Sequence, residues 1–271
     1  MFCELVCGPP GSGKTTYCEG KRQFLSVYDP SRPVVLVNFD PGNDGIFPYP
    51  CDVDVRDFAS LRVVAQEEHL GPNGSYLFCA DVIMEHIDEV VEAISSMSLQ
   101  KEHALAPGAA KPPYVIVDCP GQVEFYTQCD VLHHLERKLM KKLRCSICCV
   151  HLTDSVIATR DGESFVATCL LAFTTMGQYQ LPHVNVLSKW DAVELNDEQR
   201  DIFLDVGSFF TDHFNRMWTK SKGSKLYRLT EAIMDVVDGY GMVDFVPLAI
   251  EDRDMMLQLT QLIDHAMGYF S

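Results

Sequence analysis

Short apolar runs alternate with longer amphipathic stretches along this chain of 271 residues. Six of the runs have the length and composition of buried strands, and these are residues 2–7, 33–38, 114–118, 146–153, 183–188 and 244–248. Parallel strands buried on both faces read as such continuous apolar runs, with helices in the connections between them. The pattern therefore predicts an α/β fold of three layers, in which helices flank a mainly parallel sheet.

The stretches between the runs predict the helices. One helix is expected over residues 15 to about 27, and one long helix over residues 74 to about 97. Residues 193–239 have helical tendency and no catalytic signature, so we interpret them as a helical insertion and a candidate partner surface. The Ala-, Pro- and Gly-containing segment 104–113 predicts a surface loop. No segment indicates a domain boundary, and residues 1–271 are expected to form a single domain.

Charge and hydropathy narrow the classes of partner. The 22 Lys and Arg residues against 38 Asp and Glu residues give a formal net charge of −16, which repels a phosphate backbone. No apolar stretch reaches the roughly 18–20 residues that cross a bilayer. The eleven cysteines lack the paired spacing of a zinc site and are expected to be reduced thiols. We therefore expect a soluble, intracellular protein with no direct nucleic-acid or membrane partner.

A phosphate-binding motif directly follows the first predicted strand. The segment Gly8-Pro9-Pro10-Gly11-Ser12-Gly13-Lys14-Thr15 matches G-x-x-x-x-G-K-[ST] between a strand and a helix. Its glycines allow successive backbone N–H groups to point at phosphate oxygens, and the helix adds its positive end. The nucleotide phosphates are expected to contact Gly11, Ser12, Gly13, Lys14, Thr15 and Thr16, with Lys14 also serving in catalysis.

A second motif predicts a magnesium site and a γ-phosphate sensor. The apolar strand 114–118 ends in Asp118, and Gly121 follows at the spacing D-x-x-G. The Thr15 hydroxyl and the Asp118 carboxylate are expected to hold Mg²⁺. The loop 119–124 is placed to respond to the γ-phosphate, and Gln122 is placed to contact the attacking water.

A third motif indicates guanine as the base. Ser188-Lys189-Trp190-Asp191 follows a strand and resembles the [NT]-K-x-D motif of GTPases, with serine in place of the usual first residue. Guanine presents N1–H and N2–H₂ side by side, so one carboxylate accepts both, whereas adenine leaves Asp191 unpaired. Lys189 is expected to lie along the base, and the backbone near Leu248 to close its other side. Ser188 completes the predicted base site, and the expected ligands are GTP or GDP with Mg²⁺.

At this point the chain resembles the GPN-loop GTPases, a family named for a Gly-Pro-Asn insertion. The resemblance spans almost the whole chain. Among the eukaryotic paralogues of the family, the chain is most similar to the second. Its motifs are the P-loop, Asn38-Phe39-Asp40-Pro41, Gly71-Pro72-Asn73, Asp118-Cys119-Pro120-Gly121-Gln122-Val123-Glu124 and Leu181-Pro182-His183-Val184-Asn185-Val186-Leu187-Ser188-Lys189.

The resemblance implies a dimeric GTPase of the SIMIBI type. In such a dimer Asn73 would stabilise the transferring phosphate in the partner's site, and Asp40 would position the attacking water. Related dimeric ATPases carry a second lysine early in the P-loop, where this chain has Pro9. The family further implies a homodimer or a heterodimer with paralogues, and RNA polymerase subunits or assembly factors as partners. It implies a cytoplasmic protein, with passage to the nucleus left open.

Two other functions share part of this pattern. A small-molecule or nucleoside kinase carries the same P-loop, but Lys189, Asp191 and the spacing from Asp118 to Gly121 weigh against it. A module that binds GTP without turnover is the third alternative, and the intact Lys14, Thr15, Asp118 and Gln122 weigh against that function. By itself, Gly71-Pro72-Asn73-Gly74 is also typical of an ordinary turn that begins a helix.

Overall fold

The computed structural model describes residues 1–270 except residues 44, 46, 107, 123–124, 126–128, 211–213 and 215–222. Seven parallel strands form one sheet in the order β3-β2-β4-β1-β5-β6-β7. The strands are β1 (Phe2–Cys7), β2 (Val34–Asn38), β3 (Val53–Asp54), β4 (Tyr114–Asp118), β5 (Ser146–Asp154), β6 (His183–Ser188) and β7 (Phe245–Leu248). The six predicted strands are present within one or two residues of their predicted ends, and the parallel sheet confirms the predicted fold class.

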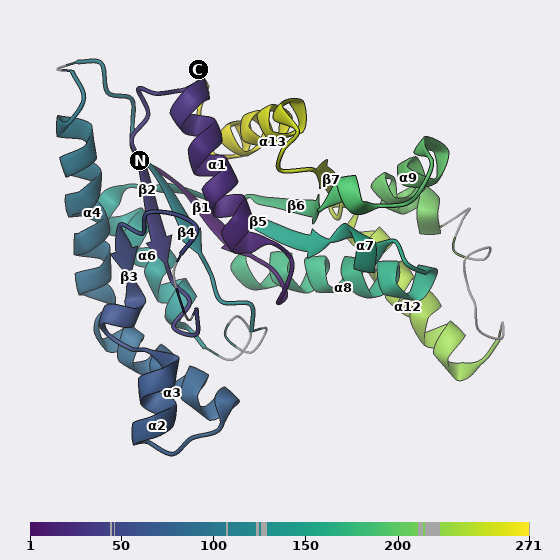
Figure 1. Cartoon of the computed structure of the whole chain (residues 1–271). Helices are drawn as coiled ribbons and strands as arrows, with labels where there is room; N and C mark the ends of the chain where they lie inside the picture. Colours follow the sequence, from purple (N-terminus) through teal and green to yellow (C-terminus); the bar gives the residue numbers. More distant parts are fainter. Residues whose placement is uncertain are drawn as a thin grey trace.

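Helices cover both faces of the sheet, as Figure 1 shows. On one face α1 (Lys14–Tyr28) and α13 (Arg253–Ala266) pack over Val6, Ile116 and Val150. The other face carries α4 (Ile87–His103), α6 (Val131–Leu143) and α8 (Gly162–Tyr179). Alternate residues of the central strands β2, β4, β1 and β5 thus enter two separate apolar cores, which is why these strands read as continuous apolar runs.

The prediction of one helix over residues 74–97 was wrong. Two helices occupy this region, α3 (Pro72–Glu85) and α4, and they meet at His86, where φ is −96° and ψ is 9°. The ring of His86 stacks on Phe58 with centroids 5.2 Å apart. Both helices contact α6, but α3 also packs against α2 (Leu61–Glu67), whereas α4 also packs against β2 and β3. Leu77 of α3 is exposed although it is apolar.

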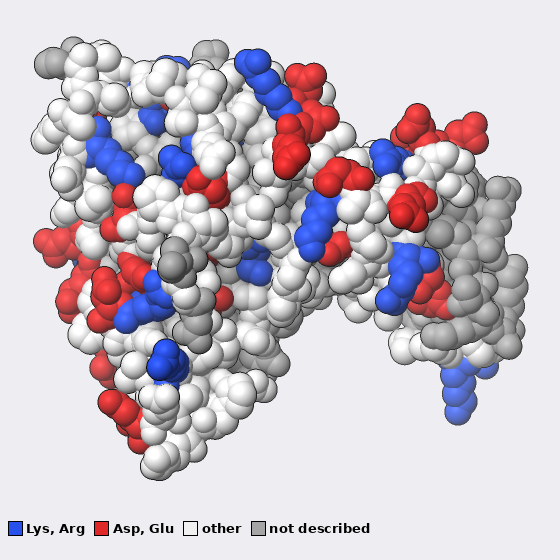
Figure 2. Space-filling view, in the orientation of Figure 1, with Lys and Arg blue, Asp and Glu red and all other residues white. Residues whose placement is uncertain are grey.

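The insertion contains helices that build a separate apolar cluster. The described elements after β6 are η2 (Trp190–Ala192), α9 (Asp197–Leu204), α10 (Val206–Ser208) and α12 (Lys225–Tyr240), and α7 (Ser155–Ala158) follows β5. Met234 and Val237 of α12 share a cluster with Phe165 of α8. In the orientation of Figure 1, Figure 2 shows α9 and α12 in a smaller lobe that joins the larger body through a narrower waist. In the described residues no helix is long and apolar enough to span a bilayer.

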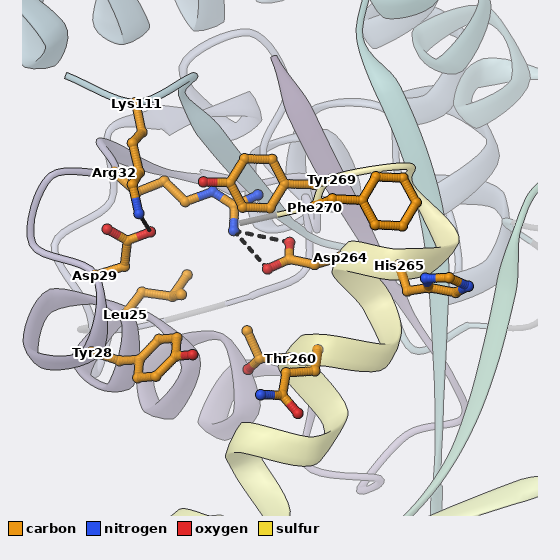
Figure 3. A pocket seen from close by; sticks show the side chains of 11 residues that line it. Leu25, Tyr28, Asp29, Arg32, Lys111, Thr260, Asp264, His265, Tyr269 and Phe270 are labelled. Atoms are coloured by element: carbon orange, nitrogen blue, oxygen red, sulfur yellow. Dashed lines mark hydrogen bonds and ion pairs between the residues drawn. The ribbon is translucent and has the colours of Figure 1, made fainter.

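A buried ion pair fastens α13 to the amino-terminal edge of the sheet. The Arg32 guanidinium is 1% exposed and donates to both carboxylate oxygens of Asp264, at 2.9 and 3.0 Å. It lies between the rings of Tyr114 and Tyr269, 4.1 and 4.2 Å from their centroids. Figure 3 shows Arg32, Asp264 and Tyr269 beside a pocket of about 430 Å³. This pocket lies at the strand end opposite to the predicted nucleotide site. The C-terminal helix is therefore held by charge and ring contacts together.

Candidate functional site

Three positions of the P-loop have backbone conformations that favour glycine. Gly8, Gly11 and Gly13 have φ values of 140°, 78° and 87°, in the region that side-chain-bearing residues rarely adopt. A Cβ on Gly8 would lie 2.1 Å from the carbonyl oxygen of Leu152. Gly13 is the N-cap of α1, so the helix begins at Lys14 with its first N–H groups free for an anion.

Lys14 lies folded against this loop. Its ammonium donates to the carbonyl oxygens of Gly8 and Pro9, each at 3.0 Å, and the residue is 8% exposed. Burial lowers the pKa of Lys14, whereas the Asp118 and Asp40 carboxylates oppose that effect. A phosphate would supply the anionic partner that two neutral carbonyl oxygens do not, so the position fits a nucleotide phosphate.

The D-x-x-G segment meets the P-loop. A Cβ on Gly121 would lie 3.1 Å from the Cα atom of Pro10 and 3.2 Å from the Lys14 ammonium. Glycine therefore permits the close approach that the motif predicts. Gln122 follows and is half-buried, while residues 123 and 124 of the predicted loop lie outside the described residues. The proposed contact of Gln122 with water stays a prediction.

Asp118 has the features of a magnesium ligand. It is 2% exposed, and its Oδ2 atom accepts a hydrogen bond from the Tyr49 hydroxyl at 3.0 Å. Its buried Oδ1 atom accepts no hydrogen bond of normal geometry from the described residues. Burial raises the pKa of Asp118 to about 6, against the Thr15 and Tyr49 hydroxyls and the Lys14 ammonium, which lower it. Thr15 and the unpartnered Oδ1 atom thus fit a cation that prefers oxygen ligands.

Asp40 lies in the loop after β2, on the same edge of the sheet. Its Oδ1 atom accepts from the backbone N–H of Gly42 at 2.8 Å and from the Tyr76 hydroxyl at 3.3 Å. Tyr76 belongs to α3, the helix that begins with the Gly-Pro-Asn tripeptide. The predicted water-positioning acid and the helix of the family insertion are therefore in direct contact.

Asn73 lies in the first turn of α3, three residues before Tyr76, which contacts Asp40. It is the second residue of α3 and is exposed, and it makes no side-chain hydrogen bond with the described residues. Gly71 is the N-cap of this helix, so the tripeptide does start a helix as an ordinary turn would. The proposed role of Asn73 in a partner's site stays a prediction.

The guanine motif is joined to the P-loop through two side chains. The Ser188 hydroxyl is buried and lies 2.7 Å from the carbonyl oxygen of Ser12. Lys189, with φ of 56°, donates to the carbonyl oxygen of Gly11 and to the Asp154 carboxylate, both at 2.7 Å. The serine that replaces the usual motif residue therefore ties β6 to the phosphate loop.

Asp191 and Leu248 lie on the same edge of the sheet. Asp191 is exposed in η2, and its carboxylate has no hydrogen bond or ion pair with the described residues. Leu248 ends β7 beside Ser188 in the strand register, with its side chain buried. The exposed carboxylate fits the paired donors of guanine, and the backbone at Leu248 lies next to this motif. Thr16, also predicted in the site, is exposed in the first turn of α1.

Two residues of this site were not predicted from the sequence. Asp154 holds Lys189, and it ends its strand as Asp118 does, so its position was a usable signal. Tyr49 holds Asp118 from a sequence distance of 69 residues, and nothing in the segment around it indicates this contact.

A family model and two named relatives match nearly the whole chain. Residues 6–269 match the family model described as a conserved hypothetical ATP binding protein. GPN-loop GTPase 2 of Saccharomyces cerevisiae is 35% identical over 99% of this chain and 75% of its own length. GPN-loop GTPase QQT1 of Arabidopsis thaliana is 35% identical over 99% of this chain and 86% of its own length.

A solved structure has the same fold. The crystal structure of a GTPase from Pyrococcus abyssi in its apo form superposes with a TM-score of 0.74, at 21% identity, over 98% of this chain and 97% of that one. The matched relatives cover nearly the full chain. The P-loop, Asp40, Asp118 and Ser188 all lie at or just after the carboxyl ends of parallel strands. The chain therefore belongs to the GPN-loop GTPase family.

Proposed function

We propose that this protein binds GTP together with Mg²⁺ and hydrolyses the anhydride bond between its β- and γ-phosphates, releasing GDP and inorganic phosphate. The observation that carries the proposal is the contact between the guanine motif and the P-loop, where the Lys189 ammonium lies 2.7 Å from the Gly11 carbonyl oxygen. Phosphate-binding and base-binding segments are thereby held at a fixed separation, as one nucleotide requires. The relatives named as GTPases support the proposal.

The side chains divide the work of phosphoryl transfer among them. Lys14 would neutralise the β- and γ-phosphates, and Gly121 lies close to its ammonium. Bound at Thr15 and Asp118, Mg²⁺ would supply charge neutralisation of the phosphate oxygens. Asp40, held by Tyr76, is the candidate for orienting the attacking water. Hydrolysis in this arrangement depends on positioning and charge stabilisation.

We further propose that the protein works as a dimer, either with itself or with a paralogue. Asn73 is exposed at the start of α3 and has no side-chain hydrogen bond with the described residues, which suits a role in a partner's site. On the family resemblance, the dimer would act in the cytoplasm, with passage to the nucleus, on RNA polymerase II or III subunits or their assembly factors. The net charge of −16 and the helical lobe with α9 and α12 suit protein partners.

Phosphate release from GTP and from ATP tests the enzymatic part. We expect release from GTP, little from ATP, and none in Lys14→Ala. Asn73→Ala should keep GTP affinity within about threefold and lose about 100-fold or more in turnover, the usual cost of one transition-state donor. Unchanged turnover in that variant would remove Asn73 from the mechanism.

Two readouts separate the alternatives. A kinase would release little phosphate until an acceptor is added, and a binding module would release none under any condition.

Sedimentation of the nucleotide-bound protein tests the dimer, and mixing Asn73→Ala with Lys14→Ala subunits tests catalysis in trans. Recovered turnover in the mixture is expected, since one composite site then keeps both residues.

A further inference from the structure

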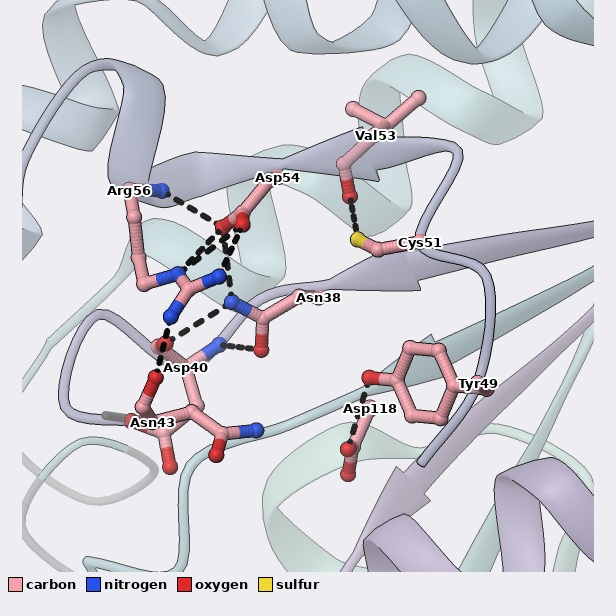
Figure 4. Close-up of polar contacts among 9 residues, drawn as sticks. All are labelled: Asn38, Asp40, Asn43, Tyr49, Cys51, Val53, Asp54, Arg56 and Asp118. Carbon is pink, nitrogen blue, oxygen red and sulfur yellow. Dashed lines mark hydrogen bonds and ion pairs between the residues drawn. The ribbon is translucent and has the colours of Figure 1, made fainter. Parts of the chain in front are cut away.

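One oxygen of the candidate magnesium carboxylate is already bound by a tyrosine. The Tyr49 hydroxyl donates to Oδ2 of Asp118 at 3.0 Å, as Figure 4 shows, and Tyr49 is 4% exposed. The other oxygen, Oδ1, is buried and lacks a hydrogen bond of normal geometry within the described chain. The two oxygens of this carboxylate therefore have different roles.

This contact fixes the plane of the carboxylate. The Cα of Asp118 is fixed by β4, which pairs with β1 and β2 in the centre of the sheet, but its terminal torsion is broad and soft. A hydrogen bond to Oδ2 selects one rotation and leaves Oδ1 directed elsewhere. Groups that orient a metal ligand in this way contribute substantially to metal affinity.

The ring of Tyr49 is itself held by stacked groups. Phe47 stacks on it with centroids 5.1 Å apart and an interplanar angle of 21°. The Arg56 guanidinium lies 4.3 Å from the Phe47 ring centroid. Arg56 is anchored by the Asp54 carboxylate at 2.7 Å and by the carbonyl oxygen of Asn43 at 2.6 Å. Phe47 and Arg56 thus form a support for the tyrosine ring.

The same support reaches the loop that carries Asp40. The amide of Asn38 donates to Oδ1 of Asp54 at 2.8 Å and to the carbonyl oxygen of Asp40 at 3.1 Å. Figure 4 shows this network around Asp54 and Arg56, with the Tyr49–Asp118 contact beside it. The magnesium carboxylate and the water-positioning loop are therefore braced by one segment of chain.

We propose that Tyr49 is a positioning residue for the magnesium site, acting through the Asp118 carboxylate. The inference rests on the proposed function, because it assumes that Asp118 serves Mg²⁺. The hydroxyl holds Oδ2 so that Oδ1 faces the metal or its bound water. Phe47 and Arg56 hold the ring in place for that hydrogen bond.

Tyr49→Phe removes only the hydroxyl, and Tyr114→Phe is its matched control. Tyr114 starts the strand that Asp118 ends, and its hydroxyl donates to another buried carboxylate, that of Glu4. The measurement is the affinity of a fluorescent GDP analogue as Mg²⁺ is titrated from a chelated, metal-free start. In Tyr49→Phe the Mg²⁺ concentration for half-maximal effect should rise about tenfold, the lower end for such supporting residues. Tyr114→Phe should match the wild type.

Metal-free nucleotide affinity provides the second readout. It should change less than about twofold in Tyr49→Phe, because the P-loop contacts do not involve this hydroxyl. Phe47→Leu keeps the hydroxyl but loosens the ring, and it should give a smaller rise in the half-maximal Mg²⁺ concentration. In an Asp118→Asn background, adding Tyr49→Phe should have no further effect on the response to Mg²⁺.

The outcomes distinguish this inference from the proposed function. If the nucleotide affinity of the wild-type protein did not change with Mg²⁺ concentration, the magnesium site itself would be refuted. A wild type that responds to Mg²⁺, with Tyr49→Phe unchanged from it, would overturn the role of Tyr49 alone. An equal shift in Tyr49→Phe and Tyr114→Phe, or a shift that persists beside Asp118→Asn, would also overturn it.

Discussion

Asp191→Asn should change which purine this protein prefers. The carboxylate is exposed and has no partner among the described residues, so the substitution should alter folding stability by no more than about 0.5 kcal/mol. Its effect is then confined to the base. Lys189 and Ser188 keep their bonds to the P-loop, and the phosphate contacts remain.

The magnitude follows from the hydrogen bonds that are lost. Aspartate offers two charged acceptors to guanine N1–H and N2–H₂, each worth about 1.5–3 kcal/mol. Asparagine offers one neutral acceptor and turns its own N–H₂ toward another donor. A loss of about 3 kcal/mol or more, equal to roughly 100-fold in affinity, is therefore expected for GDP. Xanthine carries a carbonyl oxygen in place of the N2 amino group, so xanthosine diphosphate should bind Asp191→Asn better than GDP.

Displacement of a fluorescent nucleotide by GDP, xanthosine diphosphate and ADP measures the three affinities. Asp197→Asn, at the start of α9, is a matched exposed control and should behave as the wild type. Asp191→Ala should lose guanine preference without gaining xanthine. Retained preference for GDP in Asp191→Asn, or an equal loss for all three ligands, would refute the assignment of Asp191 to the base.

Two other predictions concern pH and stability. Burial raises the pKa of Asp118 to about 6, and Mg²⁺ binds the ionised carboxylate. Mg²⁺ affinity should therefore fall about tenfold from pH 7 to pH 5. The Mg²⁺ titration with the fluorescent GDP analogue measures this change. A fall that begins only below about pH 4 would contradict this cause. Asp264→Asn leaves the buried Arg32 guanidinium without its carboxylate and should cost about 3 kcal/mol of unfolding free energy in urea titrations. Arg160→Gln, in an exposed pair, should cost far less, and equal losses would mean that burial does not matter here.

Local backbone requirements explain what could be predicted from the sequence. The P-loop glycines have φ values that favour glycine, and the apolar strands lead to Asp118 and Ser188 at the sheet edge. These features depend on residues that are close together in the sequence. Such signals predicted the strands, and they predicted that the phosphate and base motifs lie at one edge of the sheet.

Long-range contacts explain what the sequence missed. The apolar spacing continues from Ile83 through Ile87 to Val90, so periodicity alone does not reveal the break at His86, where the ring stacks on Phe58. The two-residue strand β3 is too short for an alternation to be seen. The hydrogen bond from Tyr49 depends on a fold that brings together residues far apart along the chain.

The bonds from Ser188 and Lys189 to carbonyl oxygens of the P-loop limit how base selectivity can be re-engineered. Both side chains donate hydrogen bonds to the backbone of the P-loop. Replacing either one to admit a different base would therefore also weaken binding of the triphosphate. The Asp191 carboxylate makes no such bond to the P-loop within the described chain. Substitution of Asp191 can therefore change base selectivity by itself, whereas Ser188 and Lys189 are constrained by their bonds to the P-loop.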